Sequence, residues 1–152
     1  GALPIDPYSQ TPLHAGAQQP GMTGQVKQEL LARFGKLGIR VQGGSVRFET
    51  GLLRAREFVT APASLRFLDV SGQWREQLVP TSGLAFTWCQ VPFIYRIDDL
   101  VAPTVSVHRD SGEIDSLPSL SLPAAVASEI FQRSGHIRLI ELVLSSNMLL
   151  SE

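Results

Sequence analysis

The longest apolar run of the chain is residues 84–97, LAFTWCQVPFIYRI. Read with the two-residue period of a strand, it places Leu84, Phe86 and Trp88 on one side, and its other side is apolar as well. A strand with two apolar faces is typical of one that is covered above and below, so we predict that Trp88 belongs to the core. Pro92 cannot donate to a strand ladder, and we therefore expect two strands that share a kink, or a bulge that carries the chain from one sheet to another.

Glycine-containing turns divide the rest of the chain into short alternating segments. The segments 39–42 and 45–48 flank Gly43-Gly44, which fits a two-residue hairpin turn. Two further hairpins are predicted, one from 65–70 and 73–79 and one from 104–108 and 113–117. Residues 136–144 are predicted to form a closing strand.

The register of the first hairpin makes specific predictions. It places Val41 opposite Val46 on the buried face and Arg40 opposite Arg47 on the outer face. Like charges that face each other are unfavourable, so we expect an acidic group across them. The candidates are Glu49, Glu57 and the surface of a partner.

Two segments show helical spacing. Residues 24–37 follow Thr23 as an N-cap and end at Gly38. The segment 122–134 follows Ser121 as a second N-cap, carries Pro123 in its first turn and pairs Glu129 with Arg133. Residues 1–22 contain four prolines without periodicity and are interpreted as an extended leader or linker.

Together these elements predict a mainly β fold. Many strands joined by tight turns, with one helix before them and one late, indicate an antiparallel β-sandwich of jelly-roll-like form with two flanking helices. The chain has 152 residues, which is the size of one ordinary domain. We therefore predict a single sandwich domain over residues 23–152.

Charge and terminal sequence narrow the function classes. Thirteen basic and 14 acidic residues give a net charge of −1, which argues against a nucleic-acid module. Basic residues dominate 33–76, so an arginine-rich face that meets an acidic partner is one interpretation and a solvated polar face is the other. Neither a signal peptide nor a membrane span is recognisable, and together with the lone Cys89 this favours a cytoplasmic location. The first residue is glycine rather than methionine, which suggests a processed product or a fragment of a larger parent.

Few residues suggest chemistry. Phosphate-binding loops and the G-x-S-x-G elbow are absent, and Cys89 lies in an apolar run without a neighbouring histidine, so a nucleophilic role is not expected. His108, Asp110 and Glu113 are close enough in sequence to form an acid/base or cation cluster at one hairpin tip, although Asp-Ser-Gly is also ordinary turn chemistry. No metal site and no cofactor are predicted, because the three histidines lack ligand spacing.

Exposed aromatic residues on a sheet are able to stack on sugar rings. Trp74 and Tyr95 are the candidates, and Gln73 and Gln90 are able to hydrogen-bond sugar hydroxyls. The alternative for both aromatic side chains is ordinary packing in the core.

The passage ELLARFGKLGIRVQGGSVRFETGLL, residues 29–53, combines an amphipathic helix, a Leu37-Gly38-Ile39 exit and the two-glycine turn. It resembles the junction in cellobiose-phosphorylase-like and related carbohydrate-active enzymes, where the last helix of an (α/α)6 barrel leads into a C-terminal jelly-roll-like sandwich. The resemblance implies that residues 24–152 are the non-catalytic tail of a larger glycoside hydrolase or phosphorylase. The catalytic acids would then lie upstream, so the resemblance assigns no catalytic residue to this chain.

These observations favour a non-catalytic accessory or interaction domain whose partner is an upstream domain of the parent or another protein. The alternative is a freestanding carbohydrate-binding module that uses exposed Trp74 and Tyr95. A small enzyme built around His108, Asp110 and Glu113 is a third hypothesis. Neither nucleic acid nor a membrane is an expected partner.

Overall fold

The structure is a computed structural model that describes residues 5–6, 10–12 and 35–151. Most of the predicted helix 24–37 lies outside these residues, and its described end, residues 35–37, is helical. Of the predicted leader 1–22, the described residues form strands β1 (Ile5–Asp6) and β2 (Gln10–Pro12), which pair with strands of the main body.

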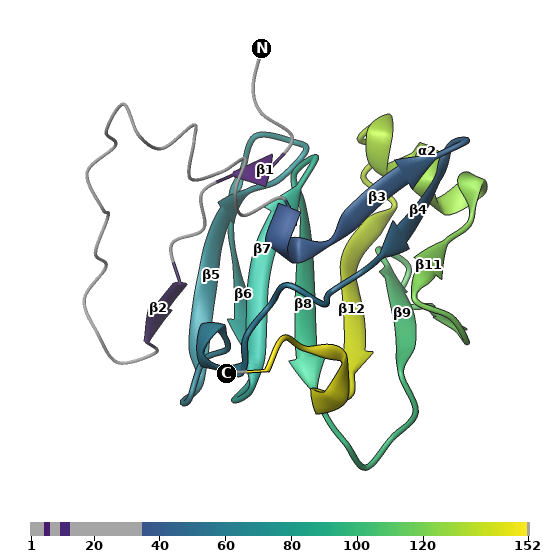
Figure 1. Cartoon of the computed structure of the whole chain (residues 1–152). Coiled ribbons are helices and arrows are strands. Elements are labelled where there is room, and N and C mark those ends of the chain that lie inside the picture. The colour runs from purple at the N-terminus through teal and green to yellow at the C-terminus, as the bar shows by residue number, and fades with distance from the viewer. Residues whose placement is uncertain (1–4, 7–9, 13–34, 152) are drawn as a thin grey trace.

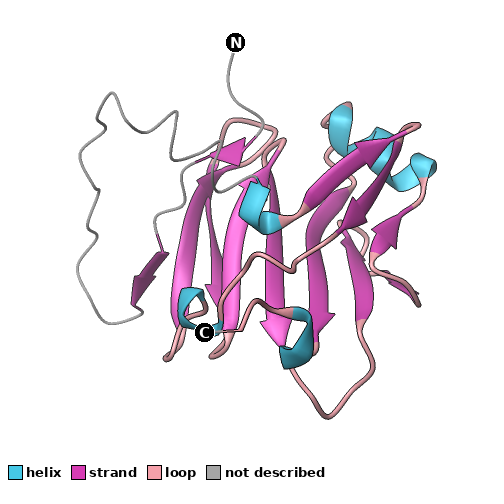
Figure 2. Ribbon diagram, viewed as in Figure 1, coloured by secondary structure: helices cyan, strands magenta, loops and turns pink. Residues whose placement is uncertain are grey.

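The described chain is mainly β and forms three sheets (Figures 1 and 2). The central sheet has the order β1-β7-β8-β12-β9-β10 and adds to β1 the strands β7 (Gly83–Trp88), β8 (Val91–Ile97), β12 (Ile137–Leu144), β9 (Thr104–Arg109) and β10 (Ile114–Leu117). The short sheet has the order β11-β4-β3, with β11 (Ser121–Leu122), β4 (Ser45–Phe48) and β3 (Ile39–Gln42). The side sheet has the order β2-β5-β6, with β5 (Ala63–Leu68) and β6 (Trp74–Val79). Helical turns η1 (Ala55–Glu57) and η2 (Ser146–Met148) and helix α2 (Ala124–Phe131) complete the described elements.

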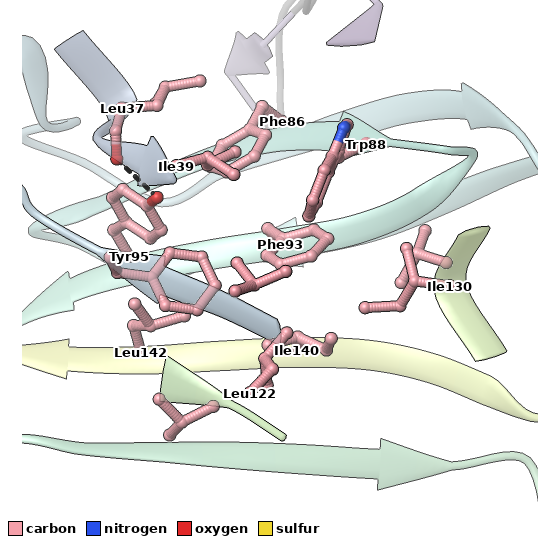
Figure 3. Close-up of a cluster of buried hydrophobic side chains, with 14 of the residues drawn as sticks. Leu37, Ile39, Phe86, Trp88, Phe93, Tyr95, Leu122, Ile130, Ile140 and Leu142 are labelled. Atoms are coloured by element: carbon pink, nitrogen blue, oxygen red, sulfur yellow. Dashed lines mark hydrogen bonds between the residues drawn. The ribbon is translucent and has the colours of Figure 1, made fainter. Parts of the chain in front are cut away.

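The main core lies between the central sheet and the layer formed by the short sheet and α2. Phe93 lies at its centre, with ring centroids 5.2 Å from Phe86, 5.9 Å from Trp88 and 6.1 Å from Phe48 (Figure 3). Trp88 is buried there, as predicted from its place in the apolar run. Aromatic rings in such tilted and stacked arrangements stabilise a core beyond their simple burial.

A smaller core covers the opposite face of the central sheet. Ala85 and Ile94 alternate with the residues of the main core and pack against Leu65 and Val79 of the side sheet. The central strands are therefore buried on both faces, which explains why residues 84–97 are apolar on both sides. The mainly β sandwich with a late helix is confirmed, and the structure adds the third sheet to it.

The structure corrects the expected kink at Pro92. Residues 84–97 form a hairpin within one sheet, and Cys89 and Gln90 make its two-residue turn with φ angles of 51° and 64°. In such a hairpin Trp88 and Val91 exchange hydrogen bonds, so the next pair, Thr87 and Pro92, needs none. The missing N–H of Pro92 therefore faces β12, whose ladder with β8 begins only at the following residue.

One strand pair departs from the antiparallel pattern. β12 lies between β8 and β9 and runs parallel to β8 but antiparallel to β9. A parallel pair needs a long crossover connection, and here residues 98–136 supply it, including β9, β10, β11 and α2. The sequence pattern did not reveal this pairing because the apolar period of a strand is the same for both directions.

The late helix is shorter than predicted. It begins at Ala124 rather than residue 122, because Ser121 and Leu122 pair with Arg47 and Val46 as strand β11. The expected pair between Glu129 and Arg133 is also wrong. Glu129 instead accepts a hydrogen bond of 2.7 Å from Nη1 of Arg109, which ties the helix to the central sheet.

The first hairpin has the predicted register, with Arg40 opposite Arg47. Glu49 supplies the expected acidic group, with ion pairs of 3.6 Å to Arg40 and 3.0 Å to Arg47. The prediction of a buried Val41 is wrong, since the side chain is 51% exposed near the end of edge strand β3. The short sheet ends at β3 within the described residues, so no neighbouring strand covers this position.

Candidate functional site

The structure places the four residues predicted to contact a ligand at three separate positions. Trp74 lies on the outward face of β6 with 61% of its surface exposed. Gln73 precedes it in the β5–β6 turn, where its Oε1 accepts from Arg75 at 3.3 Å. Gln90 lies at the β7–β8 turn on the opposite side of the side sheet, and Tyr95 lies in the main core.

Tyr95 is therefore a correction to the predicted site. The residue is fully buried, and its hydroxyl donates a hydrogen bond of 2.7 Å to the carbonyl oxygen of Leu37 (Figure 3). Burial raises the pKa of the phenol well above its usual value, so the group stays neutral. A buried tyrosine usually finds such a partner for its hydroxyl, and here the bond anchors the chain just before β3.

In the predicted cluster of His108, Asp110 and Glu113, the first two residues have different partners. Nδ1 of His108 lies 3.4 Å from Nη2 of Arg138, whereas Oδ2 of Asp110 lies 3.7 Å from Nδ1 of His136. Burial lowers the pKa of His108, Arg138 lowers it further, and Glu141 partly offsets both. Among the described residues, no three His, Cys, Asp or Glu side chains gather in a way that could hold a metal ion.

Cys89 is buried at the β7–β8 turn. Burial raises the pKa of its thiol, and the charge of Arg133 opposes that shift only in part. A raised pKa disfavours the thiolate, which is the reactive form of cysteine.

The sequence analysis missed an exposed surface on the side sheet. We call it the hairpin face, and it consists of Arg66, Leu68, Trp74, Glu76 and Leu78 on the side of β5 and β6 that faces away from the central sheet. The Arg66 guanidinium lies over the Trp74 ring, 4.5 Å from its centroid, and Leu78 is 63% exposed. The two-residue period in LRFLDV and QWREQLV places these residues on one side of the two strands, so the sequence pattern indicated this face.

A second feature, the end pocket, lies where the β5–β6 hairpin overhangs the central sheet. It has a volume of about 360 Å³ and is lined by residues of that hairpin, of the β7–β8 turn and of the segment that leads into β12. Of the four predicted ligand contacts, Gln90 lines this pocket, and of the predicted acid/base cluster, Asp110 does. Sequence reasoning could not find this pocket because its walls come from four segments that only the fold brings together.

Asp69 organises the hairpin that bounds both features. Its Oδ1 accepts from the backbone N–H and the hydroxyl of Ser71 and from the backbone N–H of Gln73, at 2.9, 2.6 and 3.0 Å. Its Oδ2 accepts from Nε of Arg75 at 2.7 Å. These bonds, led by the one from Arg75, hold the pKa of Asp69 well below its ordinary value of 3.8.

The lowered pKa of Asp69 predicts a dependence of stability on pH. A carboxyl whose pKa is lower in the folded than in the unfolded state stabilises the fold at pH values above its ordinary pKa of 3.8. This contribution to the free energy of unfolding is lost as the pH falls towards the folded-state pKa. We expect Asp69→Asn to lower the urea midpoint of unfolding at neutral pH and to converge with the wild type in acid. Glu113→Gln in the β9–β10 turn is the matched control, because no described residue is bonded to the Glu113 carboxylate, and it should leave the urea midpoint at neutral pH unchanged. Equal pH profiles for Asp69→Asn and the wild type would contradict this role.

In comparisons with known proteins, no protein-family model and no curated protein matches the chain. None of the described helices is long and apolar enough to span a membrane.

Proposed function

We propose that this chain is a non-catalytic interaction domain that docks onto another domain through the hairpin face and through the edge of β6 that pairs with no described strand. The observation that carries the proposal is the exposure of Trp74 and Leu78 on an edge strand. Large apolar side chains that share one exposed face are characteristic of interaction surfaces, and tryptophan is the residue type most enriched among binding hot spots.

The edge of β6 supplies hydrogen-bonding groups as well. The N–H of Asp69 bonds the carbonyl of Gln73, so the alternation of an antiparallel ladder directs the backbone groups of Arg75 and Gln77 towards β5. The N–H groups of Trp74, Glu76 and Leu78 then point away from β5. No described strand pairs with that side of β6. An extended segment of a partner would be able to add there as a further strand.

Arg66 indicates the charge of the partner. Its guanidinium stacks on Trp74, and no acidic side chain among the described residues forms an ion pair with it. A carboxylate on the incoming segment would pair with Arg66 beside the tryptophan ring. We therefore propose an extended, acidic and partly apolar segment of a neighbouring domain as the occupant, within a larger carbohydrate-processing protein as the sequence resemblance implies.

The test compares the isolated chain with the longest protein that its gene encodes. In the longer protein, amide exchange at Trp74, Glu76 and Leu78 should slow by at least about tenfold, because these N–H groups gain partners. The amides of Arg75 and Gln77 are internal controls, since they are already bonded to β5 in the isolated chain. A gene that encodes no further domain, or unchanged exchange at Trp74, Glu76 and Leu78, would contradict the proposal.

A matched pair of variants tests the side chains. Trp74→Ala should weaken docking by about 2 kcal/mol or more, as expected for a central aromatic contact. Leu100→Ala removes an apolar side chain that is 94% exposed in the β8–β9 loop and should leave docking unchanged. The isolated chain should also show no turnover of glycosidic substrates.

Sugar stacking on Trp74 is the second candidate function. Its support is the same exposed ring, of which Arg66 occupies one face. Tyr95 has no part in it, because that residue is buried. The other tryptophan, Trp88, is buried, so a change in tryptophan fluorescence when sugar is added would come from Trp74. Such a change would favour this alternative.

A further inference from the structure

We propose that the end pocket is a binding site for a small, uncharged, polyhydroxylated ligand of the size of a free hexose. The pocket lies on the inner side of the β5–β6 hairpin, whereas the hairpin face lies on its outer side, so this proposal does not depend on the docking function. Its volume of about 360 Å³ falls within the usual range of small-molecule sites.

The walls of the pocket combine apolar and polar surface. Phe67, Pro92 and Ile137 contribute apolar surface, against which the C–H faces of a sugar ring are able to pack. Polar side chains converge from different segments, namely Gln77 from β6, Asp110 from the β9–β10 turn and Arg138 from β12. Gln90 of the β7–β8 turn also lines the pocket, but its amide already donates to the carbonyl of Asp69 and accepts from Arg133. Apolar walls with a few convergent polar groups are the usual composition of such sites.

The charges of the pocket argue for an uncharged ligand. Asp69 and Asp110 stand against Arg75 and Arg138, so neither sign dominates. Asp69 and Arg75 are already joined at 2.7 Å, and His136 lies beside Asp110 at 3.7 Å. A phosphate or a simple cation would meet a group of its own charge on the opposite wall.

Several hydrogen-bonding groups in the pocket remain available. Nε2 of Gln77 donates to the carbonyl of Leu78 at 3.1 Å, and no described residue bonds its Oε1. The guanidinium of Arg138 is hydrogen-bonded only to Nδ1 of His108 among the described residues, at 3.4 Å. Neighbouring hydroxyls of a sugar accept from a guanidinium and donate to a carboxylate or amide oxygen at the same time, which suits Arg138, Asp110 and Gln77.

The backbone at Arg138 supports the assignment. The pairing of β12 with β9 shifts between Ile137 and Leu139, which leaves Arg138 as the extra residue of a bulge. Bulges of this kind redirect a side chain and are frequent beside functional sites. Here the extra residue, Arg138, lines the end pocket. Without the bulge it would pair with a residue of β9.

The experiment is a titration of the ¹⁵N-labelled full chain with D-glucose, D-galactose and D-mannose, followed by two-dimensional NMR. We expect saturable shifts with at least one hexose, with a Kd in about the millimolar range. They should map to the side-chain amides of Gln77 and Gln90 and to the backbone of residues 135–138. Glycine and inorganic phosphate are the charged comparison probes.

Variants separate the pocket from general effects. Arg138→Ala and Asp110→Asn should each weaken hexose binding by about tenfold, as expected for loss of one charge-assisted hydrogen bond. Arg47→Ala removes an exposed arginine from the first hairpin, far from the pocket, and should leave the affinity unchanged. Amide spectra of the variants verify that each one is folded.

Three outcomes would overturn the proposal. They are the absence of saturable shifts with every hexose, saturable shifts that map to the Trp74 indole instead of the pocket, and preferential binding of glycine or phosphate. The second outcome would support sugar stacking on the hairpin face. None of these outcomes bears on amide exchange at the β6 edge, so failure of this proposal and failure of the docking proposal are distinguishable.

Discussion

Replacing Phe93 with alanine is expected to lower the free energy of unfolding by about 3–5 kcal/mol. Phe93 is fully buried on β8, one of the two strands at the middle of the central sheet. Its ring stacks on Phe86 at an interplanar angle of 13° and also contacts Trp88 and Phe48. The substitution would remove three aromatic contacts and leave a cavity that strands of two sheets are unable to close.

Urea denaturation of the purified chain measures this effect. Phe131→Ala is the matched control, because it removes the same side chain from the edge of the core, where Phe131 is 36% exposed and contacts Trp88 alone among the described rings. We expect it to cost less than half as much as Phe93→Ala, since burial determines most of the loss. Similar costs for the two variants would show that Phe93 is not the centre of the core.

Replacing Gly38 with alanine is expected to destabilise the fold by at least about 2 kcal/mol. Gly38 has a φ of +74° at the start of the first hairpin, and a Cβ there would lie inside the carbonyl group of Glu49. The N–H of Glu49 also bonds the carbonyl of Gly38 at 2.8 Å, so the two backbones cannot separate without losing that bond. Both the backbone conformation and the close approach therefore require glycine at this position.

Gly72→Ala separates these two causes. Gly72 has a similar φ of +82° in the β5–β6 turn, but a Cβ there would meet no atom within 4 Å. Its replacement should cost only the backbone penalty of about 1–2 kcal/mol. Thermal and urea unfolding of both variants measure the difference, and equal losses would mean that the contact with Glu49 adds nothing.

Local patterns predicted the hairpins well. The Gly43-Gly44 turn identified the first hairpin and its register, including the opposition of Arg40 and Arg47. The turn residues Ser71-Gly72 and Asp110-Ser111-Gly112 identified two more. These predictions hold because a two-residue period and a turn that needs positive φ are properties of neighbouring residues.

The β7–β8 turn shows where the same reasoning fails. Cys89 and Gln90 are not typical turn residues, yet both adopt positive φ between two fully buried strand ends. Burial of Trp88 and Val91 on either side stabilises the hairpin and offsets the local backbone cost. Because this stabilisation comes from tertiary packing, the residue types of the turn do not indicate it.

The candidate sites show the same division. Trp74 was recognisable as a surface candidate because polar residues flank it, and the structure exposes it. Tyr95 has a similar chemical character, but its strand is covered on both sides and its hydroxyl is bonded to Leu37. The apolar neighbours of Tyr95 in residues 84–97 favoured burial, but only the tertiary structure places the carbonyl of Leu37, 58 residues away, beside its hydroxyl.

The sequence by itself determined the mainly β class, the hairpin turns, the burial of Trp88 and the presence of a late helix, because each follows from periodicity and backbone preference over a few residues. Only the tertiary structure decided the parallel pairing of β12 with β8, the third sheet, the partner of Glu129 and the walls of the end pocket. These features join residues that lie 20 or more positions apart, and their free energy comes from packing that forms only once the whole chain has folded.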